Sequence, residues 1–401
     1  MFLKRVWTFV LGFIHLTESA TLGLQPKLSY VKRQDDTPLL PPVVDRFTTH
    51  EPPINWYALG DSYTAGPGSG DDYDADKKCT RNNGSYAIQM SHRFPFTESN
   101  HVDFVACSGD KAPDTLIRVR DLVEENKADF MVMTLGGNDI NFSTIAKECL
   151  VKAKWLPGDC ADTIDGARKL LGAQEFEDNL HAVYDDIFAR MKDDRHYQLY
   201  HIFYHRFFND ETEWCDKESF KLTGYPKLTR ELRSNMNLLA NDLNKRLGEV
   251  VDSYIQKQTK PSWSQGPRLI GLNPDNLTRD DGETYGLFDG HRFCEPGFTR
   301  LRDPSIWFFA TYDKDSVAKR DVALEILEQY DSANCSKNPR YATDTDFRQG
   351  CDAAQSSASG QAGILTLPEL VTQTFHPKSA GFSAETRMLQ ESLQKNRPAE
   401  T

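Results

Sequence analysis

Five short apolar runs, separated by longer segments with helical periodicity, constrain the fold of this 401-residue chain more than any other feature. The runs are rich in β-branched and aromatic residues, and their length is typical of strands that are buried on both faces. They span residues 54–59, 102–106, 130–135, 198–204 and 268–272. The alternation predicts a three-layer α/β/α fold, in which helices cover both faces of a central, mainly parallel five-stranded sheet.

Helical patterns occur at 115–125, 176–191 and 227–256. In the last of these, apolar residues recur at steps of three and four and form one stripe: Leu232, Met236, Leu239, Leu243, Leu247 and Val250. Stretches rich in Gly, Pro, Asp and Asn are expected to be loops, at 66–81, 149–166, 205–225 and 273–303. The polar end of the chain is expected to fray.

Polar motifs directly follow the first three predicted strands. They are Gly60-Asp61-Ser62, Ser108-Gly109 and Gly136-Gly137-Asn138. Because the carboxyl ends of parallel strands meet at one edge of a sheet, where ligands bind, we expect these motifs to lie on one rim. A fourth motif, His376-Pro377, forms a loop near the end of the folded region.

The four motifs together contain the groups that acyl transfer requires. Ser62 is the candidate nucleophile, and His376 is the candidate base that takes its proton. Three donors are available to an oxyanion hole: the backbone N–H groups of Ser62 and Gly109, and the side-chain amide of Asn138. Asp61 is expected to brace the turn through backbone hydrogen bonds.

Other polar residues near these motifs receive structural assignments. Asp139 is expected to be structural, and His201 and His205 are expected to be buried with satisfied hydrogen bonds. The main competitor of the candidate base is His291, which we expect to pack beside Cys294. No metal site is expected, because the chain has no Cys-x-x-Cys pair, and the chemistry requires no cofactor.

The N-terminus predicts export. Lys4 and Arg5 precede an apolar stretch at 7–16 that is too short to span a bilayer, and small residues follow at Ser19 and Ala20. We therefore expect a signal peptide at 1–20, a propeptide or linker at 21–50, a catalytic domain at 51–385 and a polar tail at 386–401. The dibasic pair Lys32-Arg33 fits either a processing site or an ordinary linker.

Cysteine and asparagine usage agrees with export. The eight cysteines predict disulfides in a secreted chain: Cys79, Cys107, Cys149, Cys160, Cys215, Cys294, Cys335 and Cys351. Four Asn-x-Ser/Thr sequons are glycosylation candidates: Asn83, Asn141, Asn276 and Asn334. The net charge of −12 argues against nucleic-acid binding. We expect a monomer without a transmembrane anchor.

The order of the four motifs resembles the SGNH (GDSL-type) serine hydrolases over roughly residues 54–385. The four residues that name the family correspond to Ser62, Gly109, Asn138 and His376. This resemblance implies the flavodoxin-like SGNH fold and the hydrolysis of carboxylic esters.

The chain looks most similar to the secreted, disulfide-containing esterases and lipases of this family from actinobacteria and fungi. Cys107 precedes the second motif, and Gly290-His291-Arg-Phe-Cys294 matches a Gly-His-x-x-Cys element of that branch. The resemblance implies sequential disulfides, which cysteine spacing alone does not determine: Cys79–Cys107, Cys149–Cys160, Cys215–Cys294 and Cys335–Cys351.

Gln373 departs from the family pattern, because an aspartate usually stands three residues before the histidine. Three explanations remain open. A backbone carbonyl near Gln373 or Thr374 orients His376 in a Ser-His dyad, a carboxylate such as Glu369 or Asp289 replaces the aspartate, or the enzyme is impaired. We favour the dyad.

The substrate class also remains open. An ester of a lipid and an acylated cell-wall carbohydrate both fit the candidate chemistry, and Trp155, Trp214 and Trp307 suit either. A secreted binding protein that has kept the fold and lost catalysis is the alternative of a different class.

Overall fold

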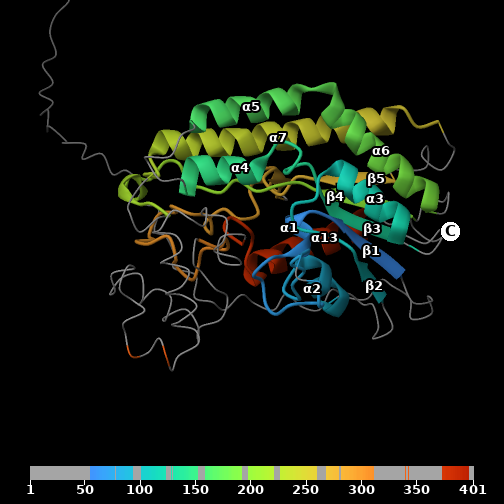
Figure 1. Ribbon diagram of the computed structural model, residues 1–401, viewed down its shortest axis with the longest axis horizontal. Helices are drawn as coiled ribbons and strands as arrows, with labels where there is room; N and C mark the ends of the chain where they lie inside the picture. The colour runs from blue at the N-terminus through green and yellow to red at the C-terminus, as the bar shows by residue number, and fades with distance from the viewer. Residues whose placement is uncertain are drawn as a thin grey trace, which may run out of the picture. The chain divides into compact units, whose positions relative to one another are not determined.

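A parallel five-stranded sheet in the order β2-β1-β3-β4-β5 forms the centre of the fold (Figure 1). The strands are β1 (Asn55–Gly60), β2 (His101–Phe104), β3 (Phe130–Thr134), β4 (Gln198–Ile202) and β5 (Leu269–Leu272). The computed structural model describes residues 55–76, 78–93, 101–122, 128, 130–151, 159–191, 197–220, 226–259, 268–279, 281–310, 339, 342 and 373–396. These residues all fall within one unit, Asp45–Thr401.

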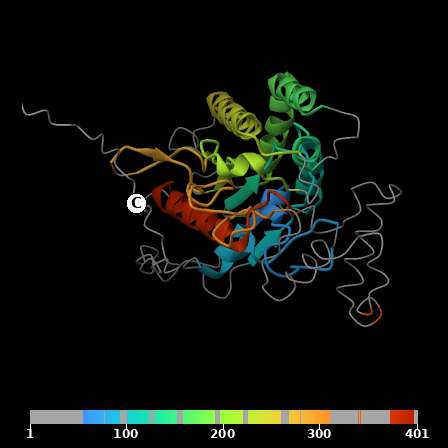
Figure 2. The same cartoon turned by 90° about the vertical axis from the view of Figure 1, so that its left-hand side faces the viewer.

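Helices cover both faces of the sheet, as the strand composition predicts (Figure 2). Trp56 and Ala58 of β1 pack on one face with α2 and α13, whereas Tyr57 and Leu59 pack on the other face with α3, α6 and α7. The helices that form these two layers are α2 (Tyr86–Arg93), α3 (Ala112–Leu122), α5 (Cys160–Gly172), α6 (Gln174–Arg190), α7 (Arg230–Gln256) and α13 (Ser379–Asn396). The predicted three-layer α/β/α class is confirmed.

Shorter elements lie in the connections. They are α1 (Ser62–Ala65), α4 (Phe142–Ala146), a π-helical turn η1 (Lys147–Val151), a 3₁₀ turn η2 (Trp214–Lys217) and the strands β6 (Leu277–Thr278) and β7 (Thr284–Tyr285). The last two pair as a small antiparallel ribbon. All five predicted strands and all three predicted helices are present, with ends that differ by a few residues.

The predicted polar tail from residue 386 is wrong for the part of it that the structure describes. Helix α13 continues through Asn396, and Leu389 and Leu393 are buried against the face of the sheet that α2 also covers. Its end is also held by a hydrogen bond from Gln198 Nε2 to the Asn396 carbonyl (3.1 Å). Apolar residues spaced four apart give this helix one apolar face, which is buried although most of its residues are polar.

The predicted loop at 149–166 is also partly wrong, because α5 begins at Cys160. Asp159 caps this helix, and its carboxylate accepts a hydrogen bond from the Ala161 N–H (2.8 Å). Ile164, Ala167 and Leu171 then bury one side of the helix. A capping residue followed by apolar residues three and four apart is a helix signal that the glycines of this stretch obscured.

Two buried asparagines of α7 hold the chain that leaves β4. The Asn244 side chain accepts from the Tyr204 N–H (3.0 Å) and donates to the Tyr204 carbonyl (2.7 Å). About two turns closer to the N-terminus of the helix, Asn237 makes the same pair of hydrogen bonds with the backbone of Phe208 (3.2 and 2.8 Å). The helix therefore supplies hydrogen-bond partners to the backbone of this segment beyond the end of β4.

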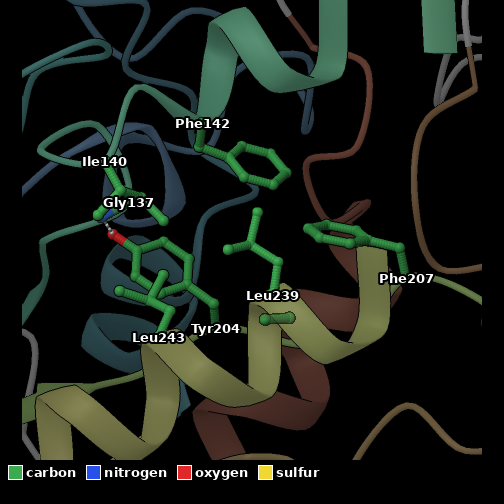
Figure 3. Close-up of a pocket in the computed structure, with 8 residues that line it drawn as sticks. Gly137, Ile140, Phe142, Tyr204, Phe207, Leu239 and Leu243 are labelled. Carbon is green, nitrogen blue, oxygen red and sulfur yellow. Dashed lines mark hydrogen bonds between the residues drawn. The ribbon is translucent and has the colours of Figure 1, made fainter. Parts of the chain in front are cut away.

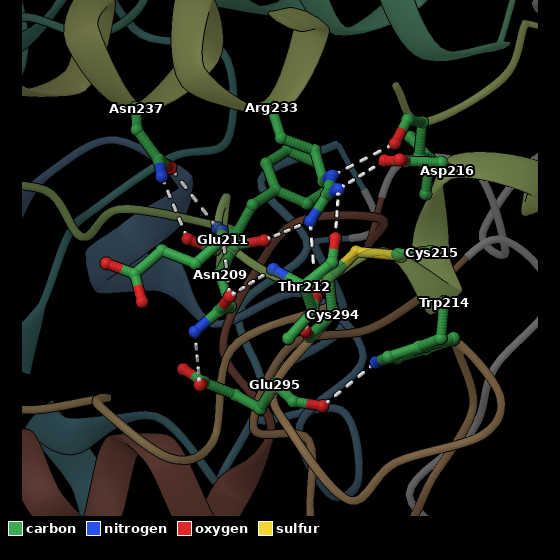
Figure 4. The surroundings of a disulfide bond; sticks show 12 residues. Asn209, Glu211, Thr212, Trp214, Cys215, Asp216, Arg233, Asn237, Cys294 and Glu295 are labelled. Atoms are coloured by element: carbon green, nitrogen blue, oxygen red, sulfur yellow. Dashed lines mark hydrogen bonds and ion pairs between the residues drawn. A yellow bond between two sulfur atoms is a disulfide. The ribbon is translucent and has the colours of Figure 1, made fainter. Parts of the chain in front are cut away.

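A disulfide and a buried arginine fasten the next part of this connection (Figure 4). Cys215 in η2 is bonded to Cys294, and the indole N–H of Trp214 donates to the Glu295 carbonyl (3.1 Å). The Arg233 guanidinium is fully buried and donates to acceptors on both sides of the turn: the carbonyls of Asn209, Thr212 and Leu228, and the carboxylate of Asp216. Its charge is therefore paired and its donors are satisfied.

Three of the disulfides that the family resemblance implies are present: Cys79–Cys107, Cys149–Cys160 and Cys215–Cys294. Cys335 and Cys351 lie outside the described residues. No helix within the described part of the chain is both long and apolar enough to cross a bilayer.

Candidate active site

The turn between β1 and α1 presents Ser62 at the carboxyl end of the sheet. Gly60 has a φ of +102°, and a Cβ at this position would lie 2.2 Å from the Thr134 carbonyl oxygen, so the close approach of β3 requires glycine. The Asp61 N–H donates to the same carbonyl (2.9 Å). Ser62 is thus the first residue of α1, and its side chain is partly exposed.

The structure brings His376 to this serine from the far end of the chain. The distance from His376 Nε2 to Ser62 Oγ is 2.7 Å, and the histidine is partly exposed like the serine. The backbone of His376 is fixed by two bonds: its carbonyl accepts from the Phe309 N–H (2.9 Å), and its N–H donates to the Gln373 carbonyl (3.0 Å). A nucleophile and a base are therefore within hydrogen-bond reach.

The two other candidate oxyanion donors, Gly109 after β2 and Asn138 after β3, lie close to each other. Gly109 is exposed and has a φ of +90°, a conformation that favours glycine although a Cβ there would meet no atom within 4 Å. The Asn138 amide donates one hydrogen to the carbonyl of Asp110, the residue after Gly109 (3.1 Å). Its second hydrogen has no partner among the described residues, so it is available to a ligand. Asp139 caps α3 by accepting from the Ala112 N–H, which is a structural role.

Asp61 accepts two hydrogen bonds in a fully buried position. Its Oδ1 accepts from the Tyr63 N–H (2.9 Å), and its Oδ2 accepts from the Tyr204 hydroxyl (2.5 Å). The Tyr204 hydroxyl in turn accepts from the Gly137 N–H (2.7 Å). Burial raises the pKa of Asp61 to about 7, and hydrogen bonds from Tyr204 and Tyr63 oppose this rise.

The sequence predicted that Asp61 holds the turn through hydrogen bonds, but it did not predict a role for Tyr204. Tyr204 lies two residues beyond β4, and the sequence analysis included it only as the last residue of the predicted strand 198–204. Its position at the carboxyl end of a strand was the available signal, because that end places it on the same rim as the three motifs.

The structure narrows the alternatives for a carboxylate beside His376. Asp289 contacts the Gly286 N–H (2.9 Å), Arg206 (3.4 Å) and Arg292 (3.3 Å), and it does not contact the imidazole. Gln373 is buried beside Gly68, where an added Cβ would lie 2.3 Å from the glutamine Oε1. Glu369 lies outside the described residues.

The other histidines near the sheet edge have partners of their own. His201 is buried between the Tyr184 hydroxyl (2.7 Å) and the Leu135 carbonyl (3.0 Å). The His205 Nε2 lies 2.7 Å from Glu385 Oε1 of α13, and the pair is buried. Burial lowers the pKa of His205 to about 3 and raises the pKa of Glu385 well above its usual value, so each group is held in its neutral form.

His291 lies flat against the Trp307 indole, with ring centroids 3.7 Å apart, and its Nδ1 is 2.8 Å from the Ser305 carbonyl oxygen. The backbone of Trp307 is hydrogen-bonded to the segment that contains His376, because the Trp307 carbonyl accepts from the Lys378 N–H (2.7 Å). His291 therefore supports this segment, and the structure gives it no bond to Ser62.

An apolar pocket lies behind the turn that carries Asn138 (Figure 3). It is small, with about 10 Å³ of room, which is enough for about one water molecule, and the surface that it exposes is apolar. The Tyr204 hydroxyl points away from it toward Gly137. The lining residues come from the β3–α4 turn, α4, the chain after β4 and α7: Gly137, Ile140, Phe142, Tyr204, Phe207, Leu239, Ala240 and Leu243.

The described sequons are exposed. Asn83 and Asn276 lie in loops, whereas Asn141 caps α4 only three residues from Asn138. The Asn141 side-chain oxygen accepts from Lys111 Nζ (2.9 Å). Asn334 lies outside the described residues, and no cluster of metal-ligating side chains occurs among the residues that are described.

Comparisons with known proteins show which family and which structures the chain resembles. The model of the GDSL-like lipase/acylhydrolase family matches residues 58–253. A lipase from Streptomyces rimosus is 31% identical over 136 residues, which are 34% of this chain and 48% of the relative, so the match spans about half of the relative's length.

Two solved structures share the fold. The extracellular lipase from Streptomyces rimosus superposes with a TM-score of 0.51 at 20% identity, and the match covers 84% of this chain and 99% of the lipase. Phospholipase A1 from Streptomyces albidoflavus has the same TM-score at 17% identity, with coverage of 86% and 100%. Over residues 58–253, about half of its length, the chain is therefore similar to the GDSL-like lipase/acylhydrolase family.

Proposed function

We propose that this protein is a secreted serine esterase or lipase that hydrolyses carboxylic esters through an acyl-enzyme. The observation that carries the proposal is the 2.7 Å separation of Ser62 Oγ and His376 Nε2 on the rim where the other family motifs converge. A serine hydroxyl is a weak nucleophile until a base accepts its proton, and this geometry supplies the base.

In the acylation step, Ser62 Oγ attacks the ester carbonyl carbon while its proton passes to His376 Nε2. The N–H groups of Ser62 and Gly109 and the free amide hydrogen of Asn138 stabilise the oxyanion. The intermediate collapses as the bond to the leaving oxygen breaks and His376 returns the proton to the alcohol. A water molecule, deprotonated by His376, then attacks the acyl-serine and releases the acid.

We favour a Ser-His dyad over a triad. The carboxylate of Asp289 is engaged by Arg206 and Arg292, and position 373 carries an amide. In such a dyad the group that would orient the imidazole is a backbone carbonyl, which carries no net charge and stabilises the imidazolium less than a carboxylate does.

The name of the curated relative, a lipase, favours an apolar acyl chain over an acetyl group on a polar carbohydrate. Two of the candidate tryptophan platforms have other partners, since Trp214 donates to Glu295 and Trp307 stacks on His291.

Export is supported by the disulfides, which persist in oxidising compartments. We propose cleavage of the signal peptide after residue 20, and N-terminal sequencing of the protein from the culture medium tests this. An intact Met1 on the exported protein would contradict it.

A fluorophosphonate probe followed by peptide mapping tests the nucleophile. We expect labelling of Ser62, and we expect the Ser62→Ala variant to lose both labelling and ester hydrolysis. Ser253 is the matched control, because its Oγ also lies close to a histidine, 3.2 Å from His181 Nε2, on the distant surface of α7. The Ser253→Ala variant should label and turn over normally, and labelling of Ser253 would refute the assignment.

A panel of esters from acetyl to long acyl chains then tests the substrate class. Faster hydrolysis of esters with medium or long acyl chains supports the lipase hypothesis. Activity confined to acetyl esters supports the carbohydrate esterase hypothesis. An exported protein that neither labels nor hydrolyses any ester would make the impaired binding protein the better explanation.

A further inference from the structure

Two buried tyrosines lie against each other beneath the candidate site. Tyr63 belongs to α1 and Tyr204 to the chain after β4, and their rings meet edge to face with centroids 5.0 Å apart. Neither hydroxyl reaches solvent, because each is engaged by partners inside the protein. These partners are immediate chain neighbours of the three residues that the mechanism requires.

Tyr204 joins the oxyanion turn to the nucleophile turn. Its hydroxyl accepts from the Gly137 N–H and donates to the Asp61 carboxylate, and the next residues in the chain are Asn138 and Ser62. Its ring packs closely against Gly137, where an added Cβ would lie 2.9 Å from the ring. At the other end of the residue, Asn244 holds both backbone groups of Tyr204.

Tyr63 joins the nucleophile turn to the base. Its hydroxyl donates to the Phe375 carbonyl (2.7 Å), and its ring centroid lies 5.2 Å from that of His376. Phe375 has a φ of +69°, which is unfavourable for a bulky residue. Its ring is held in this conformation by four aromatic neighbours: Phe207, Phe208, Phe220 and Phe293.

We infer that Tyr63 and Tyr204 are positioning residues that hold Asn138, Ser62 and His376 in one register through their hydroxyl bonds. The inference rests on the proposed esterase function. A displacement of about 1 Å at reacting groups costs roughly a hundredfold in rate, so small constraints matter here.

Single deletions of the hydroxyl groups test the inference. We expect Tyr63→Phe and Tyr204→Phe each to lower kcat about 10- to 100-fold while KM changes less than about twofold, because the substrate still binds but the reacting groups lose their alignment. Tyr184→Phe is the matched control. It also removes a buried hydroxyl with one short hydrogen bond, to His201 Nδ1, and it should leave kcat within about twofold.

A double-mutant cycle separates positioning from a general loss of stability. Since Tyr204 is inferred to act through Asn138, Tyr204→Phe should cost much less in an Asn138→Ala background than in the wild type. Tyr63 is inferred to act through His376, so Tyr63→Phe should lose the same factor in both backgrounds. Titration of competent sites with the fluorophosphonate corrects kcat for any unfolded fraction.

The outcomes are distinct. An inert wild-type protein overturns the proposed function and this inference with it. An active wild type in which both variants behave like Tyr184→Phe overturns the inference alone. An equal loss for Tyr204→Phe with and without the Asn138 amide would overturn the inferred link between the Tyr204 hydroxyl and the oxyanion donor. If Tyr204→Phe does not fold, Tyr63→Phe still decides its half of the inference.

Discussion

The buried carboxyl group of Asp61 predicts a specific pH dependence of stability. Burial raises its pKa to about 7 in the folded protein from an ordinary value of 3.8. Between these two values the folded protein keeps a proton that the unfolded chain has released, so the free energy of unfolding falls as the pH rises. The contribution is fully present below about pH 4 and is lost by about pH 7. A shift of about three units corresponds to roughly 4 kcal/mol.

Asp61→Asn removes this titration and keeps the shape of the side chain. Guanidinium unfolding of the disulfide-intact protein at pH values from about 4 to 8 gives the free energy of unfolding for both proteins. Any lost hydrogen bond shifts the variant by the same amount at every pH. The difference between variant and wild type should therefore change by up to about 4 kcal/mol in favour of the variant as the pH rises.

Two buried histidines titrate in the same pH range and do not affect this comparison. Burial lowers the pKa of His201 to about 4 and of His205 to about 3, so these histidines make the free energy of unfolding rise between about pH 4 and 6.5. Both are present in each protein, and their effect cancels in the difference. Parallel curves for the variant and the wild type across the whole range would refute the assignment of a raised pKa to Asp61.

Three further outcomes follow from the geometry. Asn138→Ala should lower kcat by about two to three decades in a steady-state ester assay, and an unchanged rate would remove its amide from the oxyanion hole. Gly60→Ala should destabilise the protein by about 3 kcal/mol or more in thermal unfolding, because the added Cβ lies 2.2 Å from a backbone carbonyl; Gly166→Ala, in the open middle of α5, should instead stabilise by about 0.5–1 kcal/mol. Replacing Cys215 and Cys294 together by alanine should cost about 4–5 kcal/mol of unfolding free energy, because the bridge closes a loop across 79 positions; a cost below about 1 kcal/mol would contradict this.

The parts of the fold that the sequence predicted are those with strong local periodicity. The apolar run that became β3 and the stripe that became α7 can be read without knowing their neighbours, and the short turns after each strand placed Gly109 and Asn138 on the rim of Ser62. Helix α13 was missed because its mean composition is polar. Its few apolar residues, among them Leu389, become meaningful only when a sheet face is present to receive them.

The supporting residues of the candidate site could not be predicted for a related reason. Tyr204 and Asp61 are 143 positions apart, and their hydrogen bond exists only because β4 and β1 lie in one sheet. Phe375 carries no sequence signal for a positive φ, which comes from the aromatic neighbours that surround its ring. Such contacts are properties of the assembled tertiary structure.

The two asparagines of α7 also limit how long the chain between their partners can be. Asn237 and Asn244 are seven residues apart, which corresponds to about 10.5 Å along a helix. Their partners, Phe208 and Tyr204, are four residues apart and reach at most about 13–14 Å when extended. Deleting one residue between them would leave almost no slack, and inserting one would form a bulge among buried side chains. A change in the length of this short stretch should therefore destabilise the protein even where every side chain is kept.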